Sequence, residues 1–332
     1  MPPDACPACR SRDSSEPVER WVDPVTTKEY RLCRCPDCAV VFSEPRTAAD
    51  PEWYSRARMG EDATPKDDWR HRVFFLENAP PADLLDVGCG AGQFLEKARA
   101  AGFRVHGFDF HAGHVRDARA RGVEVQVSDA DSFFRQRRAA YDIVTLFDVI
   151  EHVPEPAGLL AGVRDAMRPG ARLVVTTQNA RRPLLSPRNR EQWDYPPYHY
   201  TRWTPEALKT VLERAGFEVL RVHHAPLPPG FFSGLLYYRL LLWTFPTLKK
   251  LLLGADHERS RRTWTSLLEA RGNGRRPPRR LADPSFRQAL VDAGLTLFRT
   301  LAWPLETPFL MLWRALNPDR GRMFYIAARR RQ

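Results

Sequence analysis

Short apolar runs alternate with longer amphipathic stretches between residues 83 and 224. The apolar runs have the length of buried strands, and the longer stretches repeat apolar residues at helical spacing. This alternation predicts an α/β fold in which helices cover both faces of a mostly parallel sheet. The expected strands are residues 83–87, 104–108, 124–127, 142–146, 172–177 and 217–222, and the expected helices are residues 93–101, 114–121, 157–167 and 205–215.

The alternation stops between residues 226 and 320 and returns at residues 321–330, which again have the pattern of a strand. Two apolar stretches, 231–253 and 289–316, flank a basic patch at 271–280 in the interrupted region. We therefore expect a helical, basic and apolar insertion, followed by a last strand that returns to the sheet. The predicted fold is a Rossmann-like, doubly wound, mostly parallel sheet of seven strands.

Charge changes the interpretation of this insertion. The chain has a net charge of +11, and residues 226–320 contain fifteen Lys and Arg against seven Asp and Glu. Arg239 and Pro246 interrupt the first apolar stretch, which disfavours a membrane-spanning helix and favours a helix at the membrane surface. Peripheral contact of residues 231–316 with the inner face of the membrane is therefore one expectation. Cover for a substrate cleft, or contact with a second subunit, is the alternative.

Three alternate glycines follow the first expected strand, at Gly88, Gly90 and Gly92. Glycine lets the backbone approach a ligand closely and adopt angles that a side chain disfavours. The spacing is G-x-G-x-G and differs from the G-x-G-x-x-G of dinucleotide-binding folds, so the ligand need carry no phosphate. Asp86, two residues before the first glycine, would repel a phosphate and suit an ammonium group or another cation.

Polar or aromatic residues also follow the next three expected strands. Asp109 ends the second strand, where a carboxylate can accept both hydroxyls of a ribose. Asp129 and Ala130 follow the third strand, where a carboxylate can accept from an adenine amino group, and Phe147 ends the fourth. Ligands of open α/β sheets bind in the crevice at the carboxyl ends of the strands. We therefore expect these residues to line one pocket.

In this order, the motifs resemble the class I S-adenosylmethionine-dependent methyltransferase family. The resemblance covers about residues 83–224 and the returning strand at 322–329. It implies that S-adenosylmethionine is the cofactor, that its methionine part lies along the glycines, and that Phe147 packs near its sulfonium. The cofactor-binding residues that the resemblance implies are Asp86, Gly88, Gly90, Gly92, Asp109, Phe110, Asp129, Ala130 and Phe147.

The segment Asp148-x-x-Glu151-His152 is one candidate for the chemistry. On a helix, these three side chains would lie one turn apart and could converge. The segment resembles a carboxylate-x-x-Glu-His pattern of quinone-biosynthesis O-methyltransferases, which implies a divalent cation such as Mg²⁺ and a catalytic part for His152. The alternative is that Glu-His only orders the loop after the fourth strand. We favour this alternative, because the motif is short and its aspartate has less reach than a glutamate.

His199 is the second candidate for the chemistry. It lies in an aromatic-rich loop, residues 193–205, after the fifth expected strand. This loop overhangs the acceptor side of the sheet in the methyltransferase fold, so we expect His199 to take the proton of the methyl acceptor. The alternative is that His199 and the neighbouring rings only pack as a lid. Thr204 and Pro205 predict the start of the next helix.

Two cysteine pairs, Cys6-x-x-Cys9 and Cys35-x-x-Cys38, lie near the start of the chain. Two such pairs form a closed, tetrahedral site for a structural Zn²⁺ ion. We call residues 1–45 the cysteine module, and expect a zinc ribbon with a β-hairpin between the pairs, followed by a helical linker at 46–82. No signal peptide is visible, and paired cysteines without one are typical of metal binding in a reducing compartment, so we expect a cytoplasmic protein.

The sequence therefore favours methyl transfer to an oxygen or carbon of a small-molecule, sugar or lipid-linked biosynthetic intermediate. An RNA methyltransferase is the alternative that the basic charge and the cysteine module suggest. Against RNA, the fourth expected strand lacks the Asn/Asp-Pro-Pro-Tyr motif of enzymes that methylate amino groups of nucleic acids. A third alternative is a scaffold without catalysis.

Overall fold

Contacts within the chain divide the computed structural model into two units, Met1–Pro226 with Asp319–Gln332, and Leu227–Pro318. The insertion predicted at 226–320 lies almost entirely outside the described residues, as does most of the linker predicted at 46–82. Among the residues described, no helix is long and apolar enough to cross a membrane. The structure describes residues 5–13, 15–23, 25–46, 53, 68–135, 137–182, 194–225 and 321–332 of the first unit, and residues 297, 307, 308, 311–313 and 315–317 of the second.

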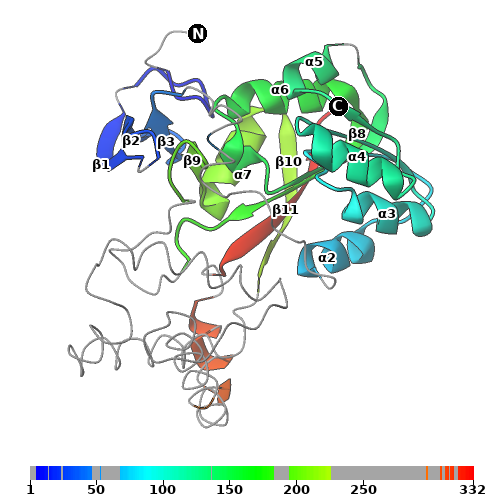
Figure 1. Ribbon diagram of the computed structural model, residues 1–332. Coiled ribbons are helices and arrows are strands. Elements are labelled where there is room, and N and C mark those ends of the chain that lie inside the picture. Colours follow the sequence, from blue (N-terminus) through cyan, green and yellow to red (C-terminus); the bar gives the residue numbers. More distant parts are fainter. Residues whose placement is uncertain are drawn as a thin grey trace, which may run out of the picture. The chain divides into compact units, whose positions relative to one another are not determined.

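The first unit is built on a seven-stranded sheet with the order β10-β11-β8-β7-β4-β5-β6 (Figure 1). Strands β4 to β8 run parallel, and β11 lies antiparallel between β8 and β10. The chain enters at β4, continues to one edge through β5 and β6, and then crosses to the other side at β7. The Rossmann-like, doubly wound sheet of the prediction is thus confirmed. The strands are β4 (Asp83–Val87), β5 (Arg104–Asp109), β6 (Val125–Val127), β7 (Tyr141–Phe147), β8 (Met167–Gln178), β10 (Phe217–His224) and β11 (Met323–Arg330).

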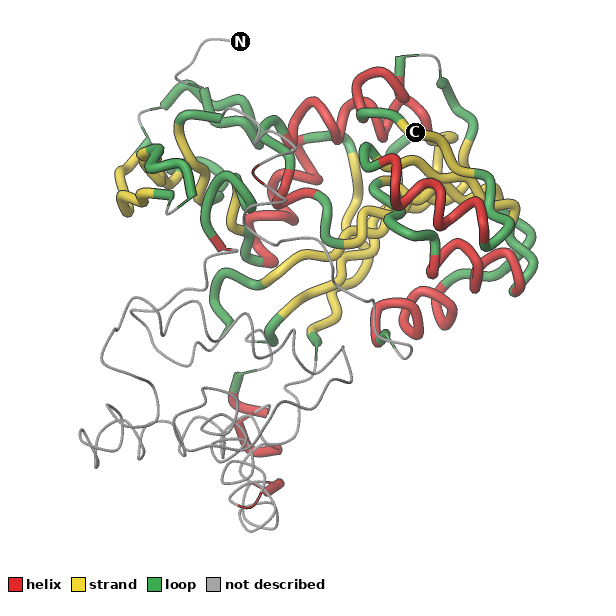
Figure 2. The backbone as a smooth tube through the Cα atoms, in the orientation of Figure 1, coloured by secondary structure: helices red, strands yellow, loops and turns green. Residues whose placement is uncertain are grey.

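Helices lie on both faces of this sheet (Figure 2). Adjacent residues of β4 point to opposite faces, because side chains alternate along a strand. Leu84 packs in a cluster with Phe74 and Leu95, whereas Leu85 packs in a second cluster with Leu160 and Leu208. The helices that contribute to the first cluster are α2 (Trp69–Glu77), α3 (Gln93–Ala100) and α4 (Ala112–Ala120). Those that contribute to the second cluster are α5 (Ala130–Phe134), α6 (Pro156–Ala166) and α7 (Pro205–Arg214). A short 3₁₀ helix, η1, spans Ile150–His152.

The ends of several elements differ from the prediction for identifiable reasons. Helix α4 begins two residues early, because the ring of His111 caps it by accepting from the backbone N–H of His114 at 3.3 Å. Helix α7 begins where expected, and the hydroxyl of Thr204 caps it by accepting from the N–H of Ala207 at 3.2 Å. Strand β10 is longer than predicted because it pairs with β11 as far as His224. Strand β8 begins earlier than predicted, at Met167, which pairs with Tyr141 of β7.

The cysteine module forms a second, smaller sheet with the order β1-β2-β3-β9. Strands β1 (Glu16–Val22) and β2 (Glu29–Arg34) form the hairpin expected between the cysteine pairs, and β3 (Val41–Glu44) follows the second pair. The fourth strand, β9 (Thr201–Arg202), belongs to the segment before α7 and pairs antiparallel with β3 (Figure 1). The loop that carries His199 therefore continues into the sheet of the module.

Candidate functional site

The turn from β4 into α3 has positive φ angles at all three glycines, 66° at Gly88, 52° at Gly90 and 78° at Gly92. A Cβ atom on Gly88 would lie 2.8 Å from Val149, and one on Gly92 would lie 2.8 Å from Ala118. Apart from the neighbours of Gly90 in the chain, no heavy atom of the described residues lies within 4 Å of the corresponding position on Gly90. Gly90 therefore faces open space, and this is the room that a cofactor along the turn requires.

Asp86 lies at the end of β4 and is only 3% exposed. Its Oδ1 accepts a hydrogen bond from the hydroxyl of Thr145 at 2.6 Å. Burial, together with the nearby carboxylate of Asp109, raises the pKa of Asp86 to about 7. A cation bound beside Asp86 would favour its ionised form and lower this pKa again. Asp86 thus suits the ammonium group of an amino acid.

Asp109 fixes the glycine turn from the neighbouring strand. Its Oδ2 accepts from the N–H of Gly90 at 3.0 Å, and its Oδ1 accepts from the N–H of His111 at 2.8 Å. A carboxylate has further lone pairs beyond these two bonds, so Asp109 can still accept from ribose hydroxyls. Phe110, the next residue, is 67% exposed, which places an aromatic ring at the surface beside the turn.

Asp129 and Ala130 lie at the carboxyl end of β6, where α5 begins. The Oδ1 of Asp129 accepts from the N–H of Ser132 at 2.8 Å, and this bond to the backbone lowers the pKa of Asp129. The exposed carboxylate is therefore ionised at neutral pH. It lies at the same edge of the sheet as Asp109, as the sequence predicts.

Phe147 ends β7 and packs edge-on against Phe94 of α3, with 4.8 Å between the ring centroids. His71 of α2 also contacts it, at 5.6 Å between centroids. Phe147 is therefore held between the helix that follows the glycine turn and the helix that precedes β4. This places the aromatic ring next to the glycine turn.

Asp148 does not join Glu151 and His152 on one helix, so the predicted convergence of these three side chains is wrong. Asp148 has a φ of 57° and lies outside η1. Its Oδ1 accepts from the hydroxyl of Thr176 at 3.0 Å, and its Oδ2 forms an ion pair with Arg70 of α2. The left-handed backbone at Asp148 turns the carboxylate towards α2 and β8.

Glu151 and His152 instead meet His199, the other candidate for the chemistry. One ligand atom of each residue lies within 4.8 Å of those of the other two. The Nδ1 of His152 lies 2.8 Å from the carbonyl oxygen of Tyr198 and, because a carbonyl only accepts, Nδ1 carries the proton. The rings of His152 and His199 lie 4.6 Å apart. We call residues 194–203, which carry His199, the acceptor loop.

Burial controls the protonation of this cluster. Glu151 is 2% exposed and His199 is 5% exposed. Burial, and then the charge of Asp148, raise the pKa of Glu151 to about 8. Burial, then His152 and two guanidinium groups, lower the pKa of His199 well below its usual value. At neutral pH, Glu151 is therefore mostly protonated, and His199 is a neutral imidazole.

A small cavity opens beside the cluster, at the carboxyl end of β8, with Glu151, Thr177, Arg182, His199 and Arg202 among the residues that line it. Three buried polar atoms of these residues, Glu151 Oε2, Thr177 Oγ1 and Arg202 Nη2, have no hydrogen-bond partner in the part of the chain that the structure describes. Leaving such a group unpaired costs about 1–3 kcal/mol, and more when it is charged. The cavity has a volume of about 10 Å³, which is room for one water molecule, and a bound water would satisfy such groups.

The charges around the cavity disfavour a divalent cation. The guanidinium groups of Arg182 and Arg202 are near enough to lower the pKa of His199. Like charges at this range repel a cation, and Mg²⁺ prefers oxygen ligands over imidazole. Asp148, the carboxylate expected to complete the site, is paired with Arg70. The residues present do not fit a magnesium ion.

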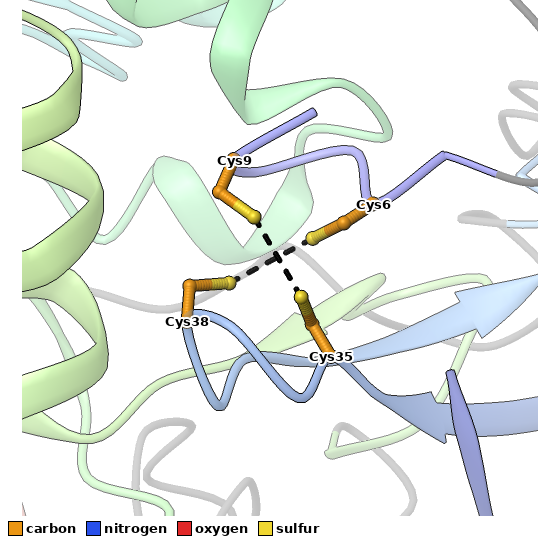
Figure 3. Close-up of side chains that lie close together, drawn as sticks. All are labelled: Cys6, Cys9, Cys35 and Cys38. Atoms are coloured by element: carbon orange, nitrogen blue, oxygen red, sulfur yellow. Dashed lines mark hydrogen bonds between the residues drawn. The ribbon is translucent and has the colours of Figure 1, made fainter. Parts of the chain in front are cut away.

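The four cysteines of the two pairs do converge, with their sulfurs pointing toward one another (Figure 3). The Sγ atoms of Cys6 and Cys38 lie 3.7 Å apart, and those of Cys9 and Cys35 lie 3.6 Å apart. A tetrahedral zinc ion with Zn–S bonds of about 2.3 Å holds its sulfurs about 3.8 Å apart. The group therefore fits a closed zinc site, and Cys33, which is buried in β2, lies outside it.

The prediction missed three arginines of the site. Arg70 pairs with Asp148, Arg182 pairs with the buried Asp194 at 2.6 Å, and Arg202 lines the cavity. None of them lies in a motif, and basic residues are common along this chain. Only the partners that folding brings to them distinguish these three from the other arginines.

Residues 56–222 match the family model described as Methyltransferase domain. This match covers half of the chain, and the chain belongs to that family. The predicted membership in the class I S-adenosylmethionine-dependent methyltransferases is thus confirmed.

Several curated proteins match part of this domain. The ubiquinone biosynthesis O-methyltransferase of Aromatoleum aromaticum is 34% identical over 102 residues, which are 29% of this chain and 44% of that protein. The enzyme of the same name from Aeromonas salmonicida is 35% identical over 102 residues, 29% of this chain and 43% of that protein. The chain thus spans less than half the length of these relatives.

Solved structures of methyltransferases also align with this chain at low identity. An S-adenosylmethionine-dependent methyltransferase from Archaeoglobus fulgidus aligns with a TM-score of 0.47 and 15% identity, over 78% of this chain and 91% of that one. Phosphoethanolamine N-methyltransferase 2 of Haemonchus contortus aligns with a TM-score of 0.45 and 17% identity, over 84% of this chain and 56% of that one.

Proposed function

We propose that the protein transfers a methyl group from S-adenosylmethionine to an acidic hydroxyl of a small-molecule biosynthetic intermediate. The observation that carries the proposal is the buried cluster of Glu151, His152 and His199, which lies at the same edge of the sheet as the glycine turn. The names of the partial relatives support oxygen as the accepting atom. A sugar or lipid-linked intermediate with such a hydroxyl falls within the proposal.

On the cofactor side, the bound cofactor would supply an electrophilic methyl group with a good leaving group. The protein must then align the acceptor and exclude water. The open face of Gly90 gives room for the cofactor, and the buried Asp86 holds its ammonium group. The side chains proposed to hold the rest of the cofactor are Asp109 for the ribose, Phe110, Asp129 and Ala130 for the adenine, and Phe147 beside the sulfonium.

On the acceptor side, His199 takes the proton of the hydroxyl. It is neutral at physiological pH, but its lowered pKa makes it a weak base. A weak base removes a proton efficiently only from an acidic donor, which favours a phenol or an enol over an alcohol. Arg202 lines the same small cavity as His199, and its guanidinium stabilises the oxygen anion that forms. His152, whose Nδ1–H is bonded to Tyr198, supports the orientation of the loop.

The direct test is to incubate the purified full-length protein with methyl-labelled S-adenosylmethionine and cell extract, and to identify labelled products by mass spectrometry. We expect the label in small molecules with a phenolic or enolic oxygen. Label that enters RNA alone would contradict the proposal and support the RNA alternative. Failure of S-adenosylmethionine to raise the melting temperature would support a scaffold, because a ligand that binds the folded state must stabilise it.

Two further proposals concern the surroundings of this activity. The geometry of the four cysteines supports one structural zinc ion per chain, which elemental analysis of the purified protein measures. The basic and apolar composition of residues 231–316 supports peripheral contact with an anionic membrane surface in the cytoplasm. Flotation of the protein with vesicles that contain anionic lipid tests this contact, and vesicles of neutral lipid are the control.

A further inference from the structure

The acceptor loop has partners on two sides at once. The N–H of Tyr200 donates to the carbonyl of Glu151 at 2.8 Å, while the carbonyl of Tyr200 accepts from the N–H of Ser43 at 2.9 Å. Glu151 lies in the cluster of the candidate site, and Ser43 lies in β3 of the cysteine module. The residue next to His199 thus joins the module to the site.

Glu19 of β1 bonds to both ends of the acceptor loop. Its Oε1 accepts from the hydroxyl of Tyr195 at 2.7 Å, and its Oε2 pairs with Arg202 at 3.2 Å. The guanidinium of Arg202 also stacks over the ring of Tyr195, 4.5 Å from its centroid. The side chain of Arg202 is 8% exposed, so its pair with Glu19 is screened less than a surface pair.

Trp21, two residues further along β1, contacts the Tyr195 end of the acceptor loop with its ring. The indole stacks on the ring of Tyr195 at 4.0 Å with an interplanar angle of 15°, and its Nε1–H donates to the carbonyl of Pro196 at 3.0 Å. Glu19 and Trp21 lie on the same side of β1, because side chains two residues apart on a strand face the same way. Two side chains on one face of β1 thus bind the acceptor loop.

The four cysteines hold the strands that make these contacts. Cys35 and Cys38 form the turn between β2 and β3, and β3 pairs with β9 of the acceptor loop. The other pair lies against the core, where the N–H of Ala157 in α6 donates to the carbonyl of Pro7 at 3.0 Å. An ion shared by both pairs would therefore fix the module to the core and set the position of β3.

We propose that the cysteine module is a clamp on the acceptor loop, in which Glu19 and Trp21 are positioning residues for His199 and metal binding at the four cysteines holds the clamp closed. The proposal rests on the proposed function for the part that His199 plays, but the clamp itself does not depend on the identity of the acceptor. The clamp acts on the acceptor side alone, since the bonds described for Glu19 and Trp21 all lie on the acceptor loop.

Hydrogen exchange of the full-length protein, followed by mass spectrometry, tests the clamp without any acceptor. Trp21→Ala and Glu19→Gln are each expected to raise the exchange rate of the amides of residues 198–203 about tenfold, as the loss of one or two stabilising contacts implies. Trp21→Phe, which keeps a ring against Tyr195, is expected to restore most of the protection. Removal of metal with a zinc chelator should loosen the same amides, and added ZnCl₂ should restore them.

Glu44→Gln is the matched control, because Glu44 is also a carboxylate on a module strand but pairs with Arg31 inside the module. It should leave residues 198–203 unchanged, and no variant should change the affinity for S-adenosylmethionine more than about twofold, since none touches the glycine turn. Unchanged exchange of residues 198–203 in Trp21→Ala, or equal loosening in Glu44→Gln, would overturn the clamp. Loosened exchange in a protein that binds no S-adenosylmethionine would support the clamp and refute the proposed function.

Discussion

The glycine turn and the acceptor loop lie at the same edge of the sheet, but different lengths of chain build them. The bond that fixes the turn, from the N–H of Gly90 to Asp109, joins residues nineteen positions apart. The bond that fixes the loop, from Tyr195 to Glu19, joins residues 176 positions apart. A compact stretch of sequence thus forms the proposed cofactor side, while the proposed acceptor side depends on three distant segments. Mutations should therefore separate cofactor binding from acceptor chemistry.

The largest effect is expected on the acceptor side. His199→Ala should lower kcat about 10²- to 10⁴-fold, the usual contribution of a general base, and leave the dissociation constant of S-adenosylmethionine unchanged. Turnover of the labelled cofactor and calorimetry measure the two quantities. His106→Gln, a histidine of β5 outside the site, is the control and should keep full turnover. Undiminished turnover of His199→Ala would leave His199 only a packing role.

The next largest effect is expected on stability and its pH dependence, through the buried carboxylate of Asp86. The pKa of Asp86 is about 7 in the fold and 3.8 for an ordinary aspartate, so the folded protein keeps a proton that the unfolded chain has lost. Stability without cofactor should therefore fall as pH rises between these values. Asp86→Asn cannot lose this proton, and the stability difference from wild type should grow by about 4 kcal/mol between pH 4 and pH 8.

Denaturant titrations of both proteins across this pH range measure the difference. Other titrating groups are shared by the two proteins, so they cancel in the comparison. Parallel pH profiles would show that Asp86 is ionised in the fold, and would remove the argument that it is poised for a cation.

A smaller effect is expected for the carboxylate that fixes the turn. Asp109→Asn keeps an acceptor for one of the two backbone N–H groups but loses the charge that favours hydroxyl donors. Affinity for S-adenosylmethionine should fall about 10- to 100-fold by calorimetry, the usual range for hydrogen bonds to a charged group. Asp117→Asn on the exposed face of α4 is the control. Equal affinities of the two variants would place the ribose elsewhere.

The smallest effect is expected for glycine substitutions, which distinguish the loss of space for a ligand from strain in the backbone. Gly90→Ala and Gly170→Ala each add a methyl group at a positive φ where no heavy atom of the described residues, apart from chain neighbours, lies within 4 Å. Both should lose about 1–2 kcal/mol of stability from the left-handed backbone. Only Gly90→Ala should also weaken binding of S-adenosylmethionine, because only that methyl group points into the cofactor space. Equal binding by both variants would move the cofactor away from the turn.

The cofactor side was largely predictable, because its parts follow one another in the chain. Each expected strand end that bears a proposed binding residue lies within one residue of where the alternation of apolar runs predicts it, and the glycines adopt the backbone that their spacing suggests. The group of four cysteines was equally predictable, since two pairs with this spacing are typical of a zinc site. These predictions depend on local patterns that the rest of the fold leaves intact.

The acceptor side was predicted only in part. His199 and Glu151 were identified as candidates, but their proximity, and the loss of Asp148 to Arg70, could not be foreseen. The lowered pKa of His199 could not be foreseen either, because it results from burial and from neighbouring guanidinium groups. A pKa depends on everything within several ångströms of the group, and the chain alone does not say what that is.

The sequence by itself determined the succession of strands and helices along the chain, the glycine turn and the two cysteine pairs, because each depends on residues that are close in the chain or on a pattern with a fixed period. Only the tertiary structure decided which residues surround His199. It joined β3 to β9, brought Glu19 and Trp21 to Tyr195, and left polar atoms of Glu151 and Arg202 facing one cavity. Contacts of this kind arise from packing between distant segments, and no local pattern encodes them.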